Sequence, residues 1–162
     1  MIIIVMRRKR PNNTTVLHGL SDAGTAECYQ LSGMEQKQER IVWNMENKSL
    51  EMAKLAISAL EDKKAEDIKV IDISEVSVMA DYFIIAGGSN RSQIQALCDN
   101  VDEKLSKAGF PARQTEGYDS ANWVLLDFQD VIVHIFDKEN RLLYDLERIW
   151  RDGKSIDINQ LK

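Results

Sequence analysis

The segment Tyr82-Phe-Ile-Ile-Ala86, followed by Gly87-Gly-Ser-Asn90, determines the fold class. A short run of only apolar residues is typical of a central strand that is buried on both faces. Ser89 or Asn90 can cap a following helix, and Gly109 can end it. The apolar positions between these signals recur at helical spacing: Ile94, Leu97, Cys98, Val101 and Leu105. A buried strand followed directly by a helix predicts an α/β protein.

The chain on both sides of this segment predicts the rest of a sheet. Upstream, an amphipathic helix is expected over about 47–64, before the β-branched strand Ile68-Lys-Val-Ile-Asp-Ile73. Downstream, a weak strand near 113–118 precedes two stronger ones, Trp123-Val-Leu-Leu-Asp-Phe128 and Val131-Ile-Val-His-Ile-Phe136. Only two residues separate the stronger strands, so we expect a tight hairpin in which residue 126 pairs with 133 and 124 with 135.

A last helix is expected before Gly153. Its apolar residues are predicted to lie on one face: Leu142, Leu143, Leu146, Ile149 and Trp150. Trp150 and Tyr144 are expected in the core. The whole pattern predicts an α/β fold with a mixed sheet of about five strands flanked by helices.

The folded domain is expected to begin near Met45. Residues 1–44 show no sustained helical or strand period, and they predict a leader that is disordered or loosely attached. A sharper hypothesis is that Met45 is the true start and that the leader is not native. We therefore expect a domain over 45–152 and a C-terminal tail over 153–162.

Charge and composition exclude several classes of function. The leader carries six Lys/Arg and four Asp/Glu, whereas residues 45–162 carry fifteen and twenty-two, a net charge of −7. Such an acidic domain is a poor general binder of nucleic acid and suits a basic protein partner better, and we expect no direct sequence-specific nucleic-acid binding. No apolar run is long enough to span a membrane, and the basic residues follow the first apolar stretch, unlike those of a secretory signal. We expect a cytoplasmic protein.

The number and spacing of the cysteines and histidines do not predict a metal centre. Cys28 and Cys98 lie far apart without a CxxC motif, and the only histidines are His18 and His134. We expect reduced thiols and no metal or cofactor.

The turn Gly87-Gly-Ser-Asn-Arg91 is a candidate phosphate cradle, because it lies before a helix N-terminus. It is similar to the Gly-Ser turn of the nucleotidyltransferase fold. Those enzymes hold Mg²⁺ with a DxD pair after the helix, and Arg113-Gln-Thr-Glu-Gly-Tyr118 contains no such pair. A nucleotide-binding or nucleotidyltransferase-like enzyme is therefore the alternative function, and we expect no catalytic residues.

The hairpin offers two further interpretations. Alternation places Asp127, His134 and Trp123 on one face, where a His–Asp pair could act in acid–base chemistry or could simply fix the hairpin. The hairpin has no Ser or Cys nucleophile. Trp123 with the nearby carboxylates Asp127 and Asp130 could instead form a binding surface for a basic partner, or Trp123 could pack under a helix.

Several separated motifs resemble one known family. Asp81-Tyr-Phe-Ile-Ile-Ala-Gly-Gly-Ser-Asn-Arg91 and Trp123-Val-Leu-Leu-Asp127-Phe-Gln-Asp130-Val-Ile-Val-His134-Ile-Phe136 are similar, in order and spacing, to motifs of the ribosomal silencing factor (Iojap-like) family. Leu60–Asp67, Val70–Ile73 and Leu143–Trp150 match it as well. The resemblance covers about residues 47–151, without the leader and the last ten residues.

The resemblance implies a non-enzymatic translation repressor. Such factors bind the large ribosomal subunit through the universal large-subunit protein number fourteen and block joining of the small subunit. They have been linked to large-subunit assembly, and they are often homodimers. Their fold is similar to the nucleotidyltransferase fold without its catalytic carboxylates. The resemblance implies a partner-binding face with Trp123, Val124, Asp127, Asp130 and His134.

Overall fold

The computed structural model describes residues 48–161, and the predicted leader, 1–44, lies outside the described residues. These residues form one mixed sheet in the order β3-β4-β5-β2-β1-β6. β2 and β5 are parallel, and the other neighbouring strands are antiparallel. The strands are β1 (Glu66–Asp72), β2 (Tyr82–Gly88), β3 (Gln114–Glu116), β4 (Trp123–Asp127), β5 (Val131–Asp137) and β6 (Lys154–Ile156). The predicted α/β class with a mixed sheet is confirmed.

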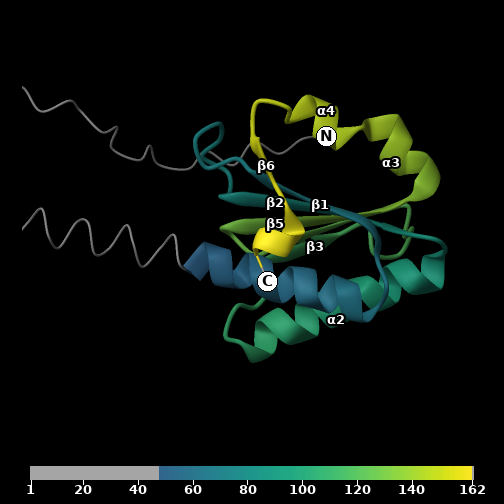
Figure 1. Cartoon of the computed structure of the whole chain (residues 1–162). Helices are drawn as coiled ribbons and strands as arrows, with labels where there is room; N and C mark the ends of the chain where they lie inside the picture. Colours follow the sequence, from purple (N-terminus) through teal and green to yellow (C-terminus); the bar gives the residue numbers. More distant parts are fainter. Residues whose placement is uncertain (1–47, 162) are drawn as a thin grey trace, which may run out of the picture.

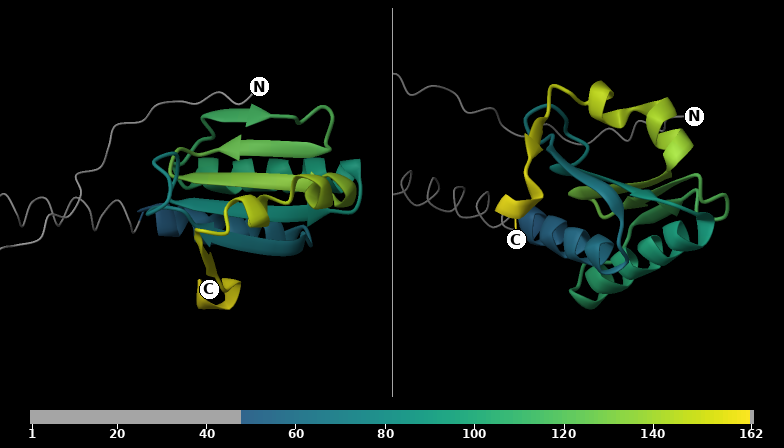
Figure 2. Two further views of the ribbon diagram at one scale, coloured as in Figure 1. Left: turned by 90° about the horizontal axis from the view of Figure 1, so that it is seen from above. Right: turned by 45° about the vertical axis from the view of Figure 1, so that its right-hand side comes forward.

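Two long helices cover one face of the sheet, and two short helices lie over the other (Figure 1). The long helices are residues 48–62 and α2 (Arg91–Lys107), and the short ones are α3 (Lys138–Tyr144) and α4 (Leu146–Ile149). The left view of Figure 2 shows the strands side by side with the long helices beneath them. The predicted cap of α2 is confirmed, because the Asn90 side chain accepts a hydrogen bond from the Gln93 backbone N–H at 2.9 Å.

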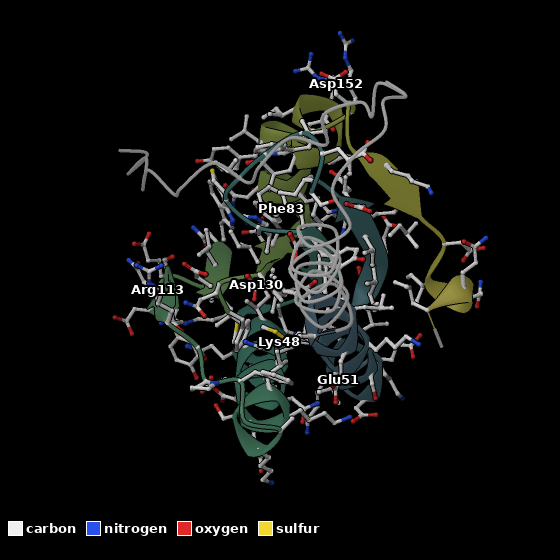
Figure 3. The ribbon with its side chains drawn as sticks, turned by 90° about the vertical axis from the view of Figure 1, so that its left-hand side faces the viewer. Lys48, Glu51, Phe83, Arg113, Asp130 and Asp152 are labelled. Atoms are coloured by element: carbon white, nitrogen blue, oxygen red, sulfur yellow. The ribbon has the colours of Figure 1, made fainter. Side chains whose placement is uncertain are left out.

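The core is divided between the two faces of the sheet. On the face of the long helices, apolar residues of 48–62 and α2 pack against Val70, Ile84, Val124, Leu126 and Val133. On the other face, Phe83, Ile85 and Phe136 pack with Leu146 of α4. Figure 3 shows Phe83 on the side of the short helices and Lys48 and Glu51 on the opposite side. Because adjacent strand residues point to opposite faces, the apolar strand β2 supplies both halves of the core.

The β4–β5 hairpin has the predicted register. Leu126 pairs with Val133 and Val124 with Ile135, and Gln129 and Asp130 form the turn. Gln129 has a φ of 73°, a left-handed conformation that is uncommon outside glycine. The Asp127 carboxylate supports this conformation by accepting a hydrogen bond from the Gln129 backbone N–H at 2.7 Å.

The sheet has six strands rather than about five, and the sixth lies in the expected C-terminal tail. β6 pairs antiparallel with β1, with Ser155 opposite Ile71. Gly153 immediately precedes β6 at a close approach, because a Cβ there would lie 2.6 Å from a side-chain carbon of Ile71. Leu161 is buried in the core beside the first long helix. Residues 153–161 are therefore part of the fold.

The last predicted helix is broken into two. Asp145 adopts the left-handed conformation, with a φ of 42°, between α3 and α4. The prediction of one continuous apolar face was wrong, since Leu146 is the one buried residue among its five apolar positions and Trp150, partly buried, packs in the same cluster. Leu142, Leu143 and Ile149 are 75%, 74% and 60% exposed, and Tyr144 is 42% exposed rather than in the core. Within the described residues, no helix is both long and apolar enough to cross a membrane.

Candidate functional site

An aromatic cluster lies on the face of the sheet opposite the long helices. It comprises Phe83, Trp123, His134, Phe136, Tyr144 and Trp150. Phe83, His134 and Phe136 are buried, whereas Trp123 and Trp150 are partly buried and Tyr144 is exposed. The cluster therefore runs from the core of this face to its surface.

Trp123 lies where the cluster meets the solvent. It is directly opposite Phe136 in the β4–β5 ladder, and the two rings stack with centroids 5.1 Å apart. Tyr144 of α3 packs on Trp123 with centroids 4.6 Å apart. Offset aromatic pairs of this kind fix the orientation of a ring. Trp123 is thus a rigid and partly exposed aromatic side chain, as an interface anchor requires.

The sequence prediction missed the exposed apolar residues of α3 that adjoin Tyr144, the residue that packs on Trp123. Leu142, Leu143 and Tyr144 are consecutive on α3, and all three are exposed. We call Trp123, Leu142, Leu143 and Tyr144 the Trp123 surface. Three consecutive residues of a helix span too wide an arc for all of their side chains to be buried on one face. The run Leu142-Leu143-Tyr144 therefore indicated, already in the sequence, that some of these apolar side chains would be exposed. Large exposed apolar residues on the helix that contacts an aromatic anchor favour a protein-binding role.

His134 lies beneath this surface rather than on it. Its side chain is buried, and its Nδ1 accepts a hydrogen bond from Trp123 Nε1 at 3.2 Å. Burial lowers the pKa of His134 from 6.5 to about 4. The predicted His–Asp pair is not formed, because Asp127 uses its carboxylate in the hairpin turn. The ring is therefore neutral and is inaccessible to a partner.

The structure separates the acidic residues of the hairpin from Trp123. Trp123 begins β4 and Asp127 ends it, four residues or about 14 Å along the strand. Asp130 lies beyond Asp127 in the turn, and its carbonyl accepts a hydrogen bond from the Asp81 backbone N–H at 2.8 Å. Asp127 and Asp130 therefore lie together at the hairpin tip, and the prediction that they surround Trp123 was wrong.

Val124 faces the opposite side of the sheet. It is fully buried among the residues that pack against the long helices. The resemblance implied a place for Val124 on the partner-binding face, whereas its side chain lies on the opposite side of the sheet from that of Trp123, because adjacent residues of a strand point in opposite directions. Val124 contributes to the core.

The two glycines of the expected phosphate cradle are the last residues of β2, and packing explains Gly88. A Cβ at Gly88 would lie 2.6 Å from Ile94 Cγ1, so glycine is needed to let α2 approach β2. The first turn of α2 is occupied by its own side chains, since Gln93 Oε1 accepts hydrogen bonds from the Ser89 N–H and hydroxyl at 2.8 and 2.7 Å. Arg91 donates to the carbonyl of Asp119. The side chains of this segment are therefore engaged with other groups of the protein.

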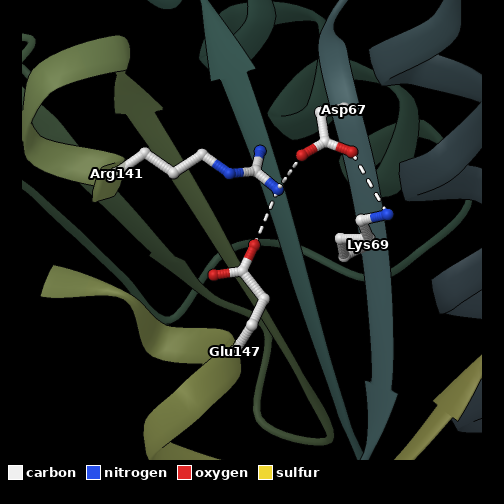
Figure 4. Close-up of polar contacts among 4 residues, drawn as sticks. All are labelled: Asp67, Lys69, Arg141 and Glu147. Atoms are coloured by element: carbon white, nitrogen blue, oxygen red, sulfur yellow. Dashed lines mark hydrogen bonds and ion pairs between the residues drawn. The ribbon is translucent and has the colours of Figure 1, made fainter.

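An ion-pair network ties α3 and α4 to the sheet (Figure 4). Arg141 Nη2 lies 2.7 Å from Glu147 Oε1 and 3.0 Å from Asp67 Oδ2. The Arg141 side chain is only 12% exposed, and its Nη1 is buried without a hydrogen-bond partner among the described residues. The network connects α4 and the start of β1 to α3, the helix that supplies Leu142, Leu143 and Tyr144 of the Trp123 surface.

The described part of the chain contains no cluster of three or more His, Cys, Asp or Glu residues that could hold a metal ion. Cys98 is a free, buried thiol on α2, and burial raises its pKa to about 12. Such a thiol is a poor nucleophile.

Comparison with known proteins gives consistent matches. A sequence model of the family described as "Ribosomal silencing factor during starvation" matches residues 46–162, including the last residues that the sequence resemblance had left out. The Bacillus subtilis (strain 168) protein "Ribosomal silencing factor RsfS" is 40% identical over 106 residues, which are 65% of this chain and 90% of that protein.

Two crystal structures are similar to the described fold. One is of a Chromobacterium violaceum protein, with a TM-score of 0.62 and 39% identity over 66% of this chain and 88% of that chain. The other is of a Bacillus halodurans protein, with a TM-score of 0.60 and 34% identity over 66% of this chain and 97% of that chain.

Proposed function

Because this chain belongs to the ribosomal silencing factor (Iojap-like) family, we propose that it is a translation repressor that binds the large ribosomal subunit. The direct partner is the universal large-subunit protein number fourteen, and the bound domain blocks joining of the small subunit. This action requires no chemistry by the domain. A folded domain at the joining surface prevents docking by excluded volume.

The observation that carries this proposal is the Trp123 surface. It presents a tryptophan in contact with Phe136 and Tyr144, and the two residues that precede Tyr144 on α3 are leucines that are three-quarters exposed. Tryptophan and tyrosine are enriched among the residues that dominate binding energies at protein interfaces. The net charge of −7 over residues 45–162 supports a basic protein as partner, because complementary charge steers association.

The remaining parts of the proposal follow from the same family. The protein acts in the cytoplasm, contributes to assembly of the large subunit, and is a homodimer when free. Asp127 and Asp130 at the hairpin tip are proposed as a secondary acidic contact with the basic partner.

Co-sedimentation with purified large subunits tests the proposed surface. Trp123→Ala should weaken binding by about 30-fold or more, because loss of a central aromatic anchor costs about 2 kcal/mol. Glu51→Ala, on the exposed side of the first long helix, is the control and should bind as wild type. Wild-type binding by a folded Trp123→Ala variant would exclude this surface.

Two further assays test the action itself. Wild-type protein should reduce joining of purified small and large subunits, and Trp123→Ala should reduce it much less. Calorimetric titration with ATP and Mg²⁺ should give no binding heat. A specific nucleotide-binding isotherm would instead support the enzyme alternative.

A further inference from the structure

The contact between Trp123 and His134 joins the exposed part of the aromatic cluster to its buried part. The indole N–H is the only polar group of the tryptophan side chain. It donates to His134 Nδ1 at 3.2 Å, and the two ring centroids are 6.0 Å apart. The two residues are diagonal neighbours in the ladder, since Trp123 is opposite Phe136 and His134 is opposite Leu125. Diagonal neighbours are within reach of long aromatic side chains.

This contact requires one tautomer of the imidazole. Since Nδ1 accepts a hydrogen bond, the proton of the neutral ring is on Nε2. Nε2 is buried and has no hydrogen-bond partner among the described residues. A protonated ring would donate from both nitrogens and could not accept from the indole. Burial lowers the pKa of His134 to about 4, so the acceptor is present throughout the physiological range.

The packing around His134 makes the acceptor rigid. The imidazole packs edge-to-face on Phe83, with centroids 5.0 Å apart, and lies nearly parallel to Phe136 at 6.3 Å. Its backbone is in the middle of β5, between Leu125 of β4 and Ile85 of β2. The ring therefore has little freedom to turn away from the indole.

We propose that His134 is a positioning residue for binding to the large subunit: its Nδ1 holds the indole of Trp123 in the orientation that the partner recognises, and its side chain does not touch the partner. This inference rests on the proposed function. Without an acceptor below it, the indole N–H would have to turn toward solvent, and the exposed edge of the ring would change. An anchor that is already oriented avoids the entropic cost of ordering on binding.

The test combines NMR spectroscopy with large-subunit binding in three variants. His134→Leu removes the acceptor, His134→Asn places an amide oxygen near the position of Nδ1, and Trp123→Phe keeps an aromatic ring without the donor. The full chain has three tryptophans, so its ¹H–¹⁵N spectrum has three indole signals. The Trp123 signal is the one that disappears in Trp123→Phe, and the Trp150 signal is an internal reference.

We expect His134→Leu to shift the Trp123 indole signal and to accelerate its hydrogen exchange, while the Trp150 signal changes little. Large-subunit binding should weaken by about fivefold to tenfold, the value of one net hydrogen bond. His134→Asn should restore much of both properties. In the Trp123→Phe background, His134→Leu should have little further effect on binding, because the donor is already absent.

Four outcomes would overturn the inference. One is an unshifted Trp123 indole signal in folded His134→Leu. Another is that His134→Leu weakens large-subunit binding equally in the wild-type and in the Trp123→Phe backgrounds. The third is that the imidazole ¹⁵N chemical shifts of His134 in the wild-type protein place the proton on Nδ1. This measurement does not depend on a variant that folds. The fourth is normal large-subunit binding by folded His134→Leu, which overturns only the positioning role. Normal binding by Trp123→Ala would instead show that the proposed surface itself is wrong.

Discussion

Arg141 Nη2 lies 2.7 Å from Glu147 Oε1, and this contact joins α3 to α4 across the left-handed residue Asp145. The same nitrogen lies 3.0 Å from Asp67 Oδ2 at the start of β1. The two carboxylates differ in environment, because the side chain of Asp67 is 62% exposed and that of Glu147 is 32% exposed. The guanidinium is buried between them, so the network connects the short helices to the sheet.

This difference predicts unequal effects of neutralising the two carboxylates. Glu147→Gln should lower the free energy of unfolding by about 1–2 kcal/mol, because it weakens a charged hydrogen bond to a buried cation. Asp67→Asn should cost less than about 1 kcal/mol, because an exposed pair is screened by water and asparagine tolerates the φ of 44° at this position. Urea unfolding of both variants measures the difference, and equal costs would contradict the assigned environments.

Gly88 predicts a packing defect that is specific to one glycine. Gly88→Ala should destabilise the protein by about 1–3 kcal/mol, since its Cβ would lie 2.6 Å from Ile94 Cγ1. Gly87→Ala is the matched control, because its Cβ would meet atoms no closer than 3.4 Å. Thermal or urea unfolding should show that Gly88→Ala lowers the free energy of unfolding less in the Ile94→Ala background, because that substitution removes the Cγ1 atom that the new Cβ would meet. Similar costs at both glycines would argue against packing as the reason for Gly88.

The features of the fold that the sequence predicted correctly depend on residues only a few positions apart. The two residues between the strands of the hairpin determined that Leu126 pairs with Val133, because a tight turn leaves only one register. The cap at Asn90 was predictable because its side chain acts on a backbone N–H three residues away.

The remaining features depend on contacts between distant segments. β6 is only three residues long, and its pairing with Ile71 of β1 has no signature in the local sequence. The break at Asp145 was hidden because the apolar residues around it keep a helical spacing through the break. The partner of His134 depends on side-chain orientation, which alternation alone does not determine. The burial of Val124 was predictable, since alternation already placed it opposite Trp123.

His134 predicts a stability that depends on pH. Its pKa is about 4 in the folded state and 6.5 without burial, so below pH 6.5 the unfolded chain binds a proton that the folded chain does not. The free energy of unfolding should therefore fall as the pH decreases from 6.5 to 4, by up to about 3 kcal/mol, and this contribution should be constant above pH 7. Urea unfolding of wild type and His134→Asn at several pH values isolates the effect. Identical pH profiles would contradict it.

The exposed leucines of α3 predict a loss of binding without a loss of stability. Leu142 and Leu143 are 75% and 74% exposed, so Leu142→Gln and Leu143→Gln remove little buried surface, and glutamine is a good helix former. The free energy of unfolding should change by less than about 0.5 kcal/mol. Binding to the large subunit should weaken by about tenfold in the double variant, because the polar groups would have to lose water at an apolar contact.

The same substitution at an exposed apolar residue outside α3 provides the control. Val78 in the β1–β2 loop is 50% exposed, and Val78→Gln should leave both stability and large-subunit binding near the wild-type values. Co-sedimentation and urea unfolding on the same preparations separate binding from folding. If the leucine variant binds as wild type while Trp123→Ala does not, the partner contacts Trp123 from the β4 side and α3 serves to hold Tyr144 against the indole. If Val78→Gln weakens binding as much as the leucine variant, the contact extends beyond α3 to the β1–β2 loop.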